Sequence, residues 1–217
     1  MMADGAFFAP GWRNVQVGSW SDAVELARRL DRWVFRGQRK ASRSLESSLR
    51  REATNAGVEA SELPAFERVV LHDLRRRGLT QGIPMDLLND PFQCMALLQH
   101  HGLPTRLLDF THSFYVAAHF ACWEARSSDT AAVWAINAVE LQEEASSRLT
   151  CSPRRFQSSD FYEELWVAAG DTEPNAVWQA TPFRMNERLA LQQGTFLLQR
   201  DITATFEESI LNTFEIS

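Results

Sequence analysis

The chain has 217 residues, of which 45% are hydrophobic and 23% are charged, and both shares are ordinary for a folded globular protein. Its net charge is −6, which makes it a poor general binder of the DNA backbone. The three cysteines show neither disulfide-framework nor zinc spacing. Because no apolar run approaches the roughly 18 residues of a membrane span and the first residues lack the regions of a secretory signal, we expect a cytoplasmic protein.

The hydrophobic pattern predicts helices and strands that interleave irregularly along the chain. Residues 1–12 are expected to be an irregular lead, and residues 13–217 to form one domain. The expected helices cover residues 23–30, 44–57, 63–77, 86–101, 114–125, 139–147, 161–169 and 186–191. The expected strands cover residues 33–35, 131–136, 176–180 and 195–198. This irregular order predicts an α+β fold, because a doubly wound sheet needs regular βαβ spacing.

Two of the expected helices carry apolar residues at helical spacing. Positions Phe66, Val69, Val70 and Leu74 are expected to face inward from the first, and Val116, Ala117, Phe120 and Ala121 from the second. The first helix ends on three arginines and Gly78, an ordinary cationic helix end, although a nucleic-acid patch is the alternative. The sequence contains neither GxGxxG nor GxxxxGK[ST], which excludes Rossmann and P-loop sites.

The first candidate site is the segment Phe35-Arg36-Gly37-Gln38 at the end of a predicted strand. An arginine beside a glycine offers a guanidinium fork next to an open main chain, and the fork fits phosphate oxygens two at a time. Glycine lets a planar ligand approach the main chain closely. These features suit a nucleotide, although a strand-end turn with a surface arginine gives the same pattern.

The second candidate site is the polar run from Gln99 to Ser113 between two apolar helices. A turn bracketed by buried residues is expected to find partners for its polar groups. Asp109 could cap the following helix or pair with Arg106, and such a structural role is compatible with function. No cysteine stands by an obvious base and no GxSxG is present, so nucleophilic catalysis is poorly supported.

Metal binding is not predicted, although several histidines are close in sequence. His100 and His101 are neighbours on a helix and point about 100° apart, so they are poorly placed to chelate together. The chain has no HExxH or CxxC pattern. His119 lies on an apolar helix face, where a core histidine is the expected identity.

The third candidate site is the segment 184–198, in which Gln192, Gln193 and Gly194 precede an apolar strand. Amide side chains at the head of a core strand can bind a ribose or the edge of a base. The alternative is that the glycine simply ends the preceding helix.

Together, these three segments resemble the FRG domain family, over about residues 20–200. The Phe/Tyr-Arg-Gly signature is matched by Phe35-Arg36-Gly37-Gln38. The family's QHHGLPTRLLDWT motif is matched by Gln99 to Thr111, with Phe110 in place of tryptophan. The later elements are matched by Ala117, Phe120 and Ala121, and then by Arg188, Gln192 or Gln193, Gly194 and Phe196.

A second resemblance is to ADP-ribosyltransferases of the arginine class. It implies an α+β fold with small split β-sheets surrounded by helices, which clamp NAD between them. Arg36 would then hold the pyrophosphate or the nicotinamide ribose, and the Gly37 main chain would pair with the carboxamide. Thr111 and Ser113, from an S/T-x-S element, would support the nicotinamide pocket.

The late glutamate of those enzymes has no counterpart here, because Gln192 and Gln193 occupy its place. An amide can accept a hydrogen bond from the ribose but supplies no negative charge, and the charge is the larger electrostatic effect. Asp109 or Glu187 could substitute, and Asp109 is preferred because it lies among other candidate site residues.

The resemblance therefore implies an NAD-dependent ADP-ribosyltransferase or NAD glycohydrolase, such as a toxin or phage-defence effector. The catalytic residues would be Asp109, Arg36 and Gln193. The residues binding the nucleotide would be Arg36, Gly37, Gln38, His101, Arg106, Thr111, Ser113 and Gln192. Its implied partners are NAD as substrate, a protein or nucleic-acid acceptor, and an antitoxin or other defence protein. The alternative is a non-catalytic nucleotide or nucleic-acid binding module.

Overall fold

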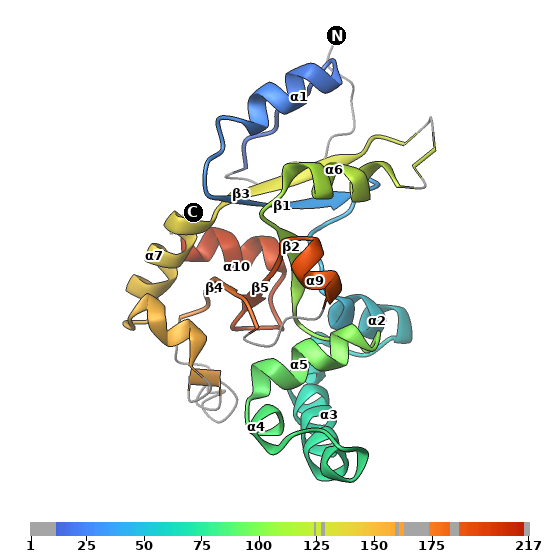
Figure 1. The fold of residues 1–217 in the computed structure, drawn as a ribbon, viewed down its shortest axis with the longest axis vertical. Coiled ribbons are helices and arrows are strands. Elements are labelled where there is room, and N and C mark those ends of the chain that lie inside the picture. Colours follow the sequence, from blue (N-terminus) through green and yellow to red (C-terminus); the bar gives the residue numbers. More distant parts are fainter. Residues whose placement is uncertain are drawn as a thin grey trace.

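A computed structural model describes residues 12–123, 125–126, 129–158, 161–162, 174–182 and 187–214 (Figure 1). Nearly all of the expected N-terminal lead and most of the expected helix over 161–169 lie outside these residues, as do the side chains of Glu187 and Arg188. None of the described helices combines the length and the apolar character that a membrane crossing requires.

Five strands form one antiparallel sheet in the order β3-β1-β2-β5-β4. The strands are β1 (Trp33–Gln38), β2 (Leu108–Thr111), β3 (Ala132–Asn137), β4 (Val177–Ala180) and β5 (Gly194–Gln199). Helices and strands mix irregularly along the chain, so the predicted α+β class is confirmed. The expectation of separate split sheets needs correction, because one sheet contains all five strands.

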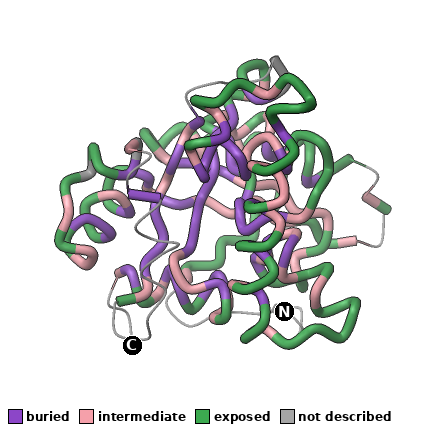
Figure 2. Tube along the Cα trace, turned by 90° about the horizontal axis from the view of Figure 1, so that it is seen from below, coloured by how far each residue is buried: buried purple, intermediate pink, exposed green. Residues whose placement is uncertain are grey.

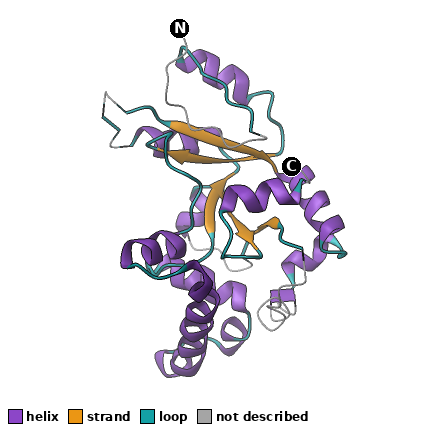
Figure 3. Cartoon of the chain, turned by 180° about the vertical axis from the view of Figure 1, so that it is seen from behind, coloured by secondary structure: helices purple, strands orange, loops and turns teal. Residues whose placement is uncertain are grey.

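The sheet is nevertheless almost divided between β1 and β2. Strand β1 pairs with β3 along its whole length, from Trp33 to Gln38, and β2 pairs with β5 along its whole length. Between β1 and β2 the register contains a single pair, Phe35 with Thr111. Figure 3 shows the β1–β3 pair and β2 running in clearly different directions. The two halves of the sheet therefore meet at one point and part beyond it.

The helices surround this sheet. They are α1 (Trp20–Ala27), α2 (Ser48–Ala56), α3 (Leu63–Gly78), α4 (Met85–Leu88), α5 (Pro91–His100), α6 (Phe114–Cys122), α7 (Ala138–Arg148), α9 (Glu187–Leu191) and α10 (Phe206–Thr213). Helix α6 lies along β1 (Figure 1), whereas Leu141 of α7 and Ile210 of α10 share a core cluster with Val34 of β1. In Figure 2 the buried stretches gather in the middle of the molecule and the exposed ones at its periphery.

The helix ends follow from local chemistry. Ser47 and Thr205 accept hydrogen bonds from main-chain N–H groups of the first turns of α2 and α10, as expected for N-cap residues. Gly57 ends α2 with φ of 71°, a left-handed conformation that glycine adopts without strain. The prediction that this helix ends at Gly57 is therefore confirmed.

Several expected elements differ from the observed ones. The helix expected over 86–101 is two helices, because Asp90 caps α5 and Pro91 follows it. The segment Leu108–Thr111, read as part of a polar turn, is strand β2, and α10 was not predicted. The strand expected to stop before Gly37 continues through it to Gln38.

The buried face of α3 is also different from the predicted one. Phe66 and Val69 are 50% and 63% exposed, whereas Glu67 is only 5% exposed. Glu67 is buried because it forms an ion pair with Arg106, a partner that no periodicity in the sequence reveals. A charged residue therefore lies on the face of α3 that packs against the core. On α6, Ala117 and Ala121 are buried as expected, but Phe120 is 40% exposed, and His119, expected in the core, is exposed as well.

Candidate functional site

The three candidate segments meet at the centre of the sheet. Phe35 of β1 pairs with Thr111 of β2, and Thr111 pairs in turn with Gly194 of β5. Strand β2 therefore lies between the other two segments, although Thr111 is more than seventy residues away in sequence from each of its two partners. The Phe-Arg-Gly segment, the middle motif and the Gln-Gln-Gly turn thus converge on one region.

Arg36 occupies the point where β1 and β2 part. Its Nη1 donates a hydrogen bond of 2.7 Å to the main-chain carbonyl oxygen of Asp109. If the pairing of Phe35 with Thr111 continued along both strands, Asp109 would lie opposite Gly37. The arginine side chain therefore bonds to a carbonyl group that an unbroken ladder would have used, and it spans the divergence between the two halves of the sheet.

The guanidinium of Arg36 retains unused hydrogen-bonding capacity. Its Nε and Nη2 make no hydrogen bond to any residue in the described ranges, and no acidic side chain lies within ion-pair distance. Burial lowers the pKa of the Arg36 guanidinium, the negative charge of Asp109 raises it, and the nearby Arg51 lowers it. A half-buried, partly desolvated cation with free donors is suited to binding an anion.

Asp109 is held at the same place by residues of the middle motif. Its Oδ1 accepts a hydrogen bond of 2.8 Å from Gln99 Nε2, and the Gln99 amide oxygen accepts one from the hydroxyl of Thr105. The second carboxylate oxygen of Asp109 has no partner among the residues that the structure describes. The side chain is exposed, so this oxygen is accessible to a ligand that also reaches Arg36.

Gly37 is explained by the packing of α6 on β1. A Cβ atom added to this glycine would lie 1.8 Å from the carbonyl oxygen of Ala117 and 2.6 Å from the main-chain nitrogen of Ala121. The space that glycine leaves is therefore filled by a helix. The interpretation that this space admits a ligand is wrong for the face that α6 covers.

Gln38 has its amide group fully engaged by the protein. Its Nε2 donates to the carbonyl oxygens of Lys40 and Arg43, and its Oε1 accepts a hydrogen bond of 3.1 Å from Trp134 Nε1. The side chain thus shapes the loop that follows β1. A nucleotide could bind this amide only by displacing one of these bonds.

Thr111 and Ser113 also have structural partners. The Thr111 hydroxyl donates a hydrogen bond of 2.6 Å to the carbonyl oxygen of Gln192 and accepts one of 3.0 Å from the Ser113 N–H. The Ser113 hydroxyl accepts a hydrogen bond from the N–H of Val116 at the start of α6. These hydroxyls fix the junction between β2, α6 and the turn before β5.

The two glutamines form the turn that leads into β5. Gln193 has a φ of 48°, an unusual value for a residue with a side chain, and its carbonyl oxygen accepts a hydrogen bond of 3.0 Å from the His112 N–H. Its side chain is exposed, and that of Gln192 is half-buried. The turn therefore lies beside the end of β2. It contains Gln193, which was predicted to stand in place of the late catalytic glutamate.

Arg106 does not share this environment. Arg106 is 7% exposed and forms a forked ion pair with Glu67, and its Nη1 donates to the carbonyl oxygens of Gln199 and Arg200. A ligand would have to break this buried pair to reach it, so its role is structural. The proposed pairing with Asp109 is likewise wrong. His101 is an exposed residue at the end of α5.

Comparison with known proteins identifies the middle of the chain. Residues 31–130 match the family model of the FRG domain. The chain contains an FRG domain. The match includes Arg36 and Asp109 but not the Gln192–Gln193 turn, which the fold brings to the same place. Neither the curated proteins nor the solved structures contain a significant match.

One residue of the FRG domain that the sequence did not single out is His112. It lines an open cleft of about 440 Å³ together with Arg32, Val139, Glu143 and Gln179, and burial lowers the pKa of its imidazole. The Gln179 amide nitrogen lies 3.2 Å from His112 Nε2 and also donates to the hydroxyl of Thr195. Only the pairing of β2, β5 and β4 brings these groups together, so no sequence signal could have found them.

The described residues contain no candidate metal site. Within the described ranges, no group of three or more histidine, cysteine, aspartate or glutamate side chains is arranged to hold a metal ion.

Proposed function

We propose that this FRG domain binds NAD at the divergence of β1 and β2 and cleaves its nicotinamide bond, as an ADP-ribosyltransferase or NAD glycohydrolase. The observation that carries this proposal is the guanidinium of Arg36, which spans that divergence with unused donors beside the carboxylate of Asp109. The arginine would bind the pyrophosphate in a forked geometry.

Asp109 is the acid that would assist bond cleavage. When the nicotinamide leaves, positive charge develops on the ribose, and a fixed carboxylate nearby stabilises that charge. Gln99 holds one oxygen of Asp109, which leaves the other for the ribose. Gln193, at the turn before β5, would contribute a neutral hydrogen bond to the same sugar.

The absence of a late glutamate supports a second candidate, a module that binds nucleotides without turnover. Gln192 and Gln193 form the turn that meets the end of β2, and neither carries a charge. If Asp109 does not serve as the catalytic acid, the site retains its anion-binding arginine and lacks its electrostatic assistance.

The test is to incubate the protein with NAD and measure nicotinamide release. Wild type should release nicotinamide, Arg36→Ala should lose binding and release together, and Asp109→Asn should still bind NAD but release at least about 100-fold less nicotinamide. The matched control is Arg28→Ala at the exposed arginine that follows the last residue of α1, which should behave as wild type.

A thermal shift with NAD, ADP-ribose and AMP separates the two candidates, because a ligand that binds only the folded state raises the melting temperature. A shift that depends on Arg36 without any release of nicotinamide supports the binding module. If neither release nor a shift is found with any of these nucleotides, both candidates are wrong.

An NAD-consuming enzyme acting on the cytoplasmic NAD pool would harm the cell that makes it, which fits a toxin or phage-defence effector held by an antitoxin or similar partner. Induced expression of wild type should then lower cellular NAD and arrest growth. Expression of Arg36→Ala at the same level should do neither.

A further inference from the structure

The loop that follows β1 carries three cations without acidic partners. Arg39, Lys40 and Arg43 make no ion pair with any residue that the structure describes. By contrast, Arg76 and Arg77 at the end of α3 both bind Asp73, at 3.2 and 3.5 Å. In a chain with a net charge of −6, these three cations within five residues form a locally basic loop.

This cationic loop has a defined shape. The amide nitrogen of Gln38 donates to the carbonyl oxygens of Lys40 and Arg43. The N–H of Ala41 donates a hydrogen bond of 2.7 Å to the carbonyl oxygen of Thr130. The main chain is therefore held at three points, and the cationic side chains project from a fixed turn.

A row of exposed aromatic rings runs along α6 to Trp123, the residue that follows the end of the helix. Tyr115 and Trp123 are 58% and 59% exposed, and His119, halfway between them in sequence, is exposed as well. Residues four apart lie on one face of a helix, and the rings of His119 and Trp123 are 5.1 Å apart. At the start of the row, Trp20 of α1 lies 6.2 Å from Tyr115.

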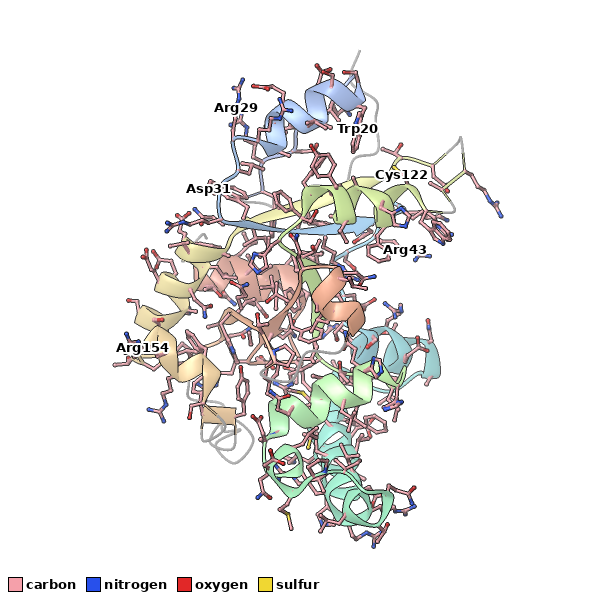
Figure 4. All side chains as sticks on the ribbon, in the orientation of Figure 1. Trp20, Arg29, Asp31, Arg43, Cys122 and Arg154 are labelled. Atoms are coloured by element: carbon pink, nitrogen blue, oxygen red, sulfur yellow. The ribbon has the colours of Figure 1, made fainter. Side chains whose placement is uncertain are left out.

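The aromatic row runs towards the cationic loop. Phe35 of β1 contacts Phe114 at the start of α6, and Gly37 lies against Ala117 and Ala121 further along the helix. Strand β1 and helix α6 therefore advance side by side in the same direction, so the loop after β1 lies next to the end of α6. Figure 4 shows Arg43 and Cys122 on the same side of the molecule, at the right of the view.

We propose that this surface, made of the 39–43 loop and the exposed aromatic row of α6, binds single-stranded nucleic acid. Unpaired cations attract the phosphates, and exposed rings stack against unpaired bases without regard to sequence. A second copy of this chain is a poor occupant, since a two-fold contact would place the same cations against each other. A duplex offers phosphates but no free base faces for the rings.

The test is fluorescence anisotropy with labelled oligouridylate and oligothymidylate of about 12 nucleotides, and with a duplex of equal length. Both single strands should bind more tightly than the duplex. Reversing three charges, in Arg39→Glu/Lys40→Glu/Arg43→Glu, should weaken binding at least about 10-fold at 50 mM salt and reduce the salt dependence by about two in the log–log slope. Trp123→Ala should weaken binding about fivefold or more.

Matched controls keep the test specific. Arg28→Glu/Arg68→Glu/Arg154→Glu makes the same change of charge at exposed positions elsewhere, and Phe66→Ala removes an aromatic ring that is 50% exposed on α3. Both should bind as wild type. The proposal is overturned if wild type binds neither strand, if the duplex binds as tightly, or if the scattered charge variant loses as much affinity. None of these results depends on NAD turnover.

Discussion

Two arginines of the FRG domain match motif positions of the family, and the protein uses them in opposite ways. Arg106 is buried, forms a forked ion pair with Glu67 and donates hydrogen bonds to two carbonyl oxygens. Its hydrogen-bonding capacity is therefore used within the fold. Arg36 makes one hydrogen bond, to Asp109, and keeps free donors at the divergence of two strands. A motif arginine is therefore a candidate for ligand binding only when the fold leaves its donors unused.

The largest expected effect compares the two arginines directly. Arg106→Met removes the forked partner of the buried carboxylate of Glu67, so it should lower the free energy of unfolding by about 3–5 kcal/mol. Arg36→Met removes one hydrogen bond from a half-buried side chain and should cost about 1 kcal/mol. Urea denaturation at neutral pH measures both. Equal losses would contradict the division of roles, and Glu67→Leu/Arg106→Met should recover most of the larger loss.

The next effect tests whether the glycine beside Arg36 is structural. Gly37→Ala places a methyl group against the main chain of α6, which cannot move away as a flexible side chain could, so the cost should be about 3 kcal/mol. Gly18→Ala is the control, because its nearest neighbour would be Asp22 at 3.7 Å, an ordinary contact. A stable Gly37→Ala protein would show that the contact between β1 and α6 relaxes easily.

A third buried charge, Glu207, behaves unlike the Arg106 pair. It accepts a hydrogen bond from the Leu45 N–H, and its second oxygen has no partner within the part of the chain that the structure describes. Burial raises the pKa of its carboxyl group, which the hydrogen bond from Leu45 partly offsets. The folded state then holds the proton longer than the unfolded one, so the stability contributed by this group falls as pH rises from about 4.5 through the folded pKa.

Glu207→Gln keeps the acceptor and removes the charge, so its stability relative to wild type should rise over that pH range. Glu207→Ala leaves the Leu45 N–H unpaired and should cost about 2 kcal/mol at acidic pH. Urea denaturation at several pH values measures both variants. If the difference in unfolding free energy between Glu207→Gln and wild type does not change with pH, the pKa of the Glu207 carboxyl group is not raised by burial.

The smallest effect on stability is expected at Gln99, which positions Asp109 beside Arg36. Gln99→Ala removes a half-buried amide and should lower the free energy of unfolding by only about 1 kcal/mol. If Asp109 acts on bound NAD, the same change should reduce kcat for nicotinamide release about 10-fold with little change in KM, because binding depends on Arg36. A purely structural role for Gln99 would leave kcat unchanged.

The sequence by itself determined the class of fold, most helices and the three candidate segments, which the sheet brings together. Helix ends such as Gly57 are local, and four-residue apolar spacing and motif positions can be read from neighbouring residues. It failed where a distant partner decides the outcome. Strand β2 is short and pairs only with segments far away in sequence, and Glu67 is buried because of Arg106.

Only the tertiary structure decided which motif residues remain available. Arg36 and Arg106 look alike in the sequence, since both are arginines within candidate segments, and their difference comes from long-range contacts. The same holds for Gly37, whose missing side chain makes room for α6, and for His112, which meets Gln179 across the sheet. Hydrogen-bonding groups have fixed capacity, and the fold alone determines where that capacity is used.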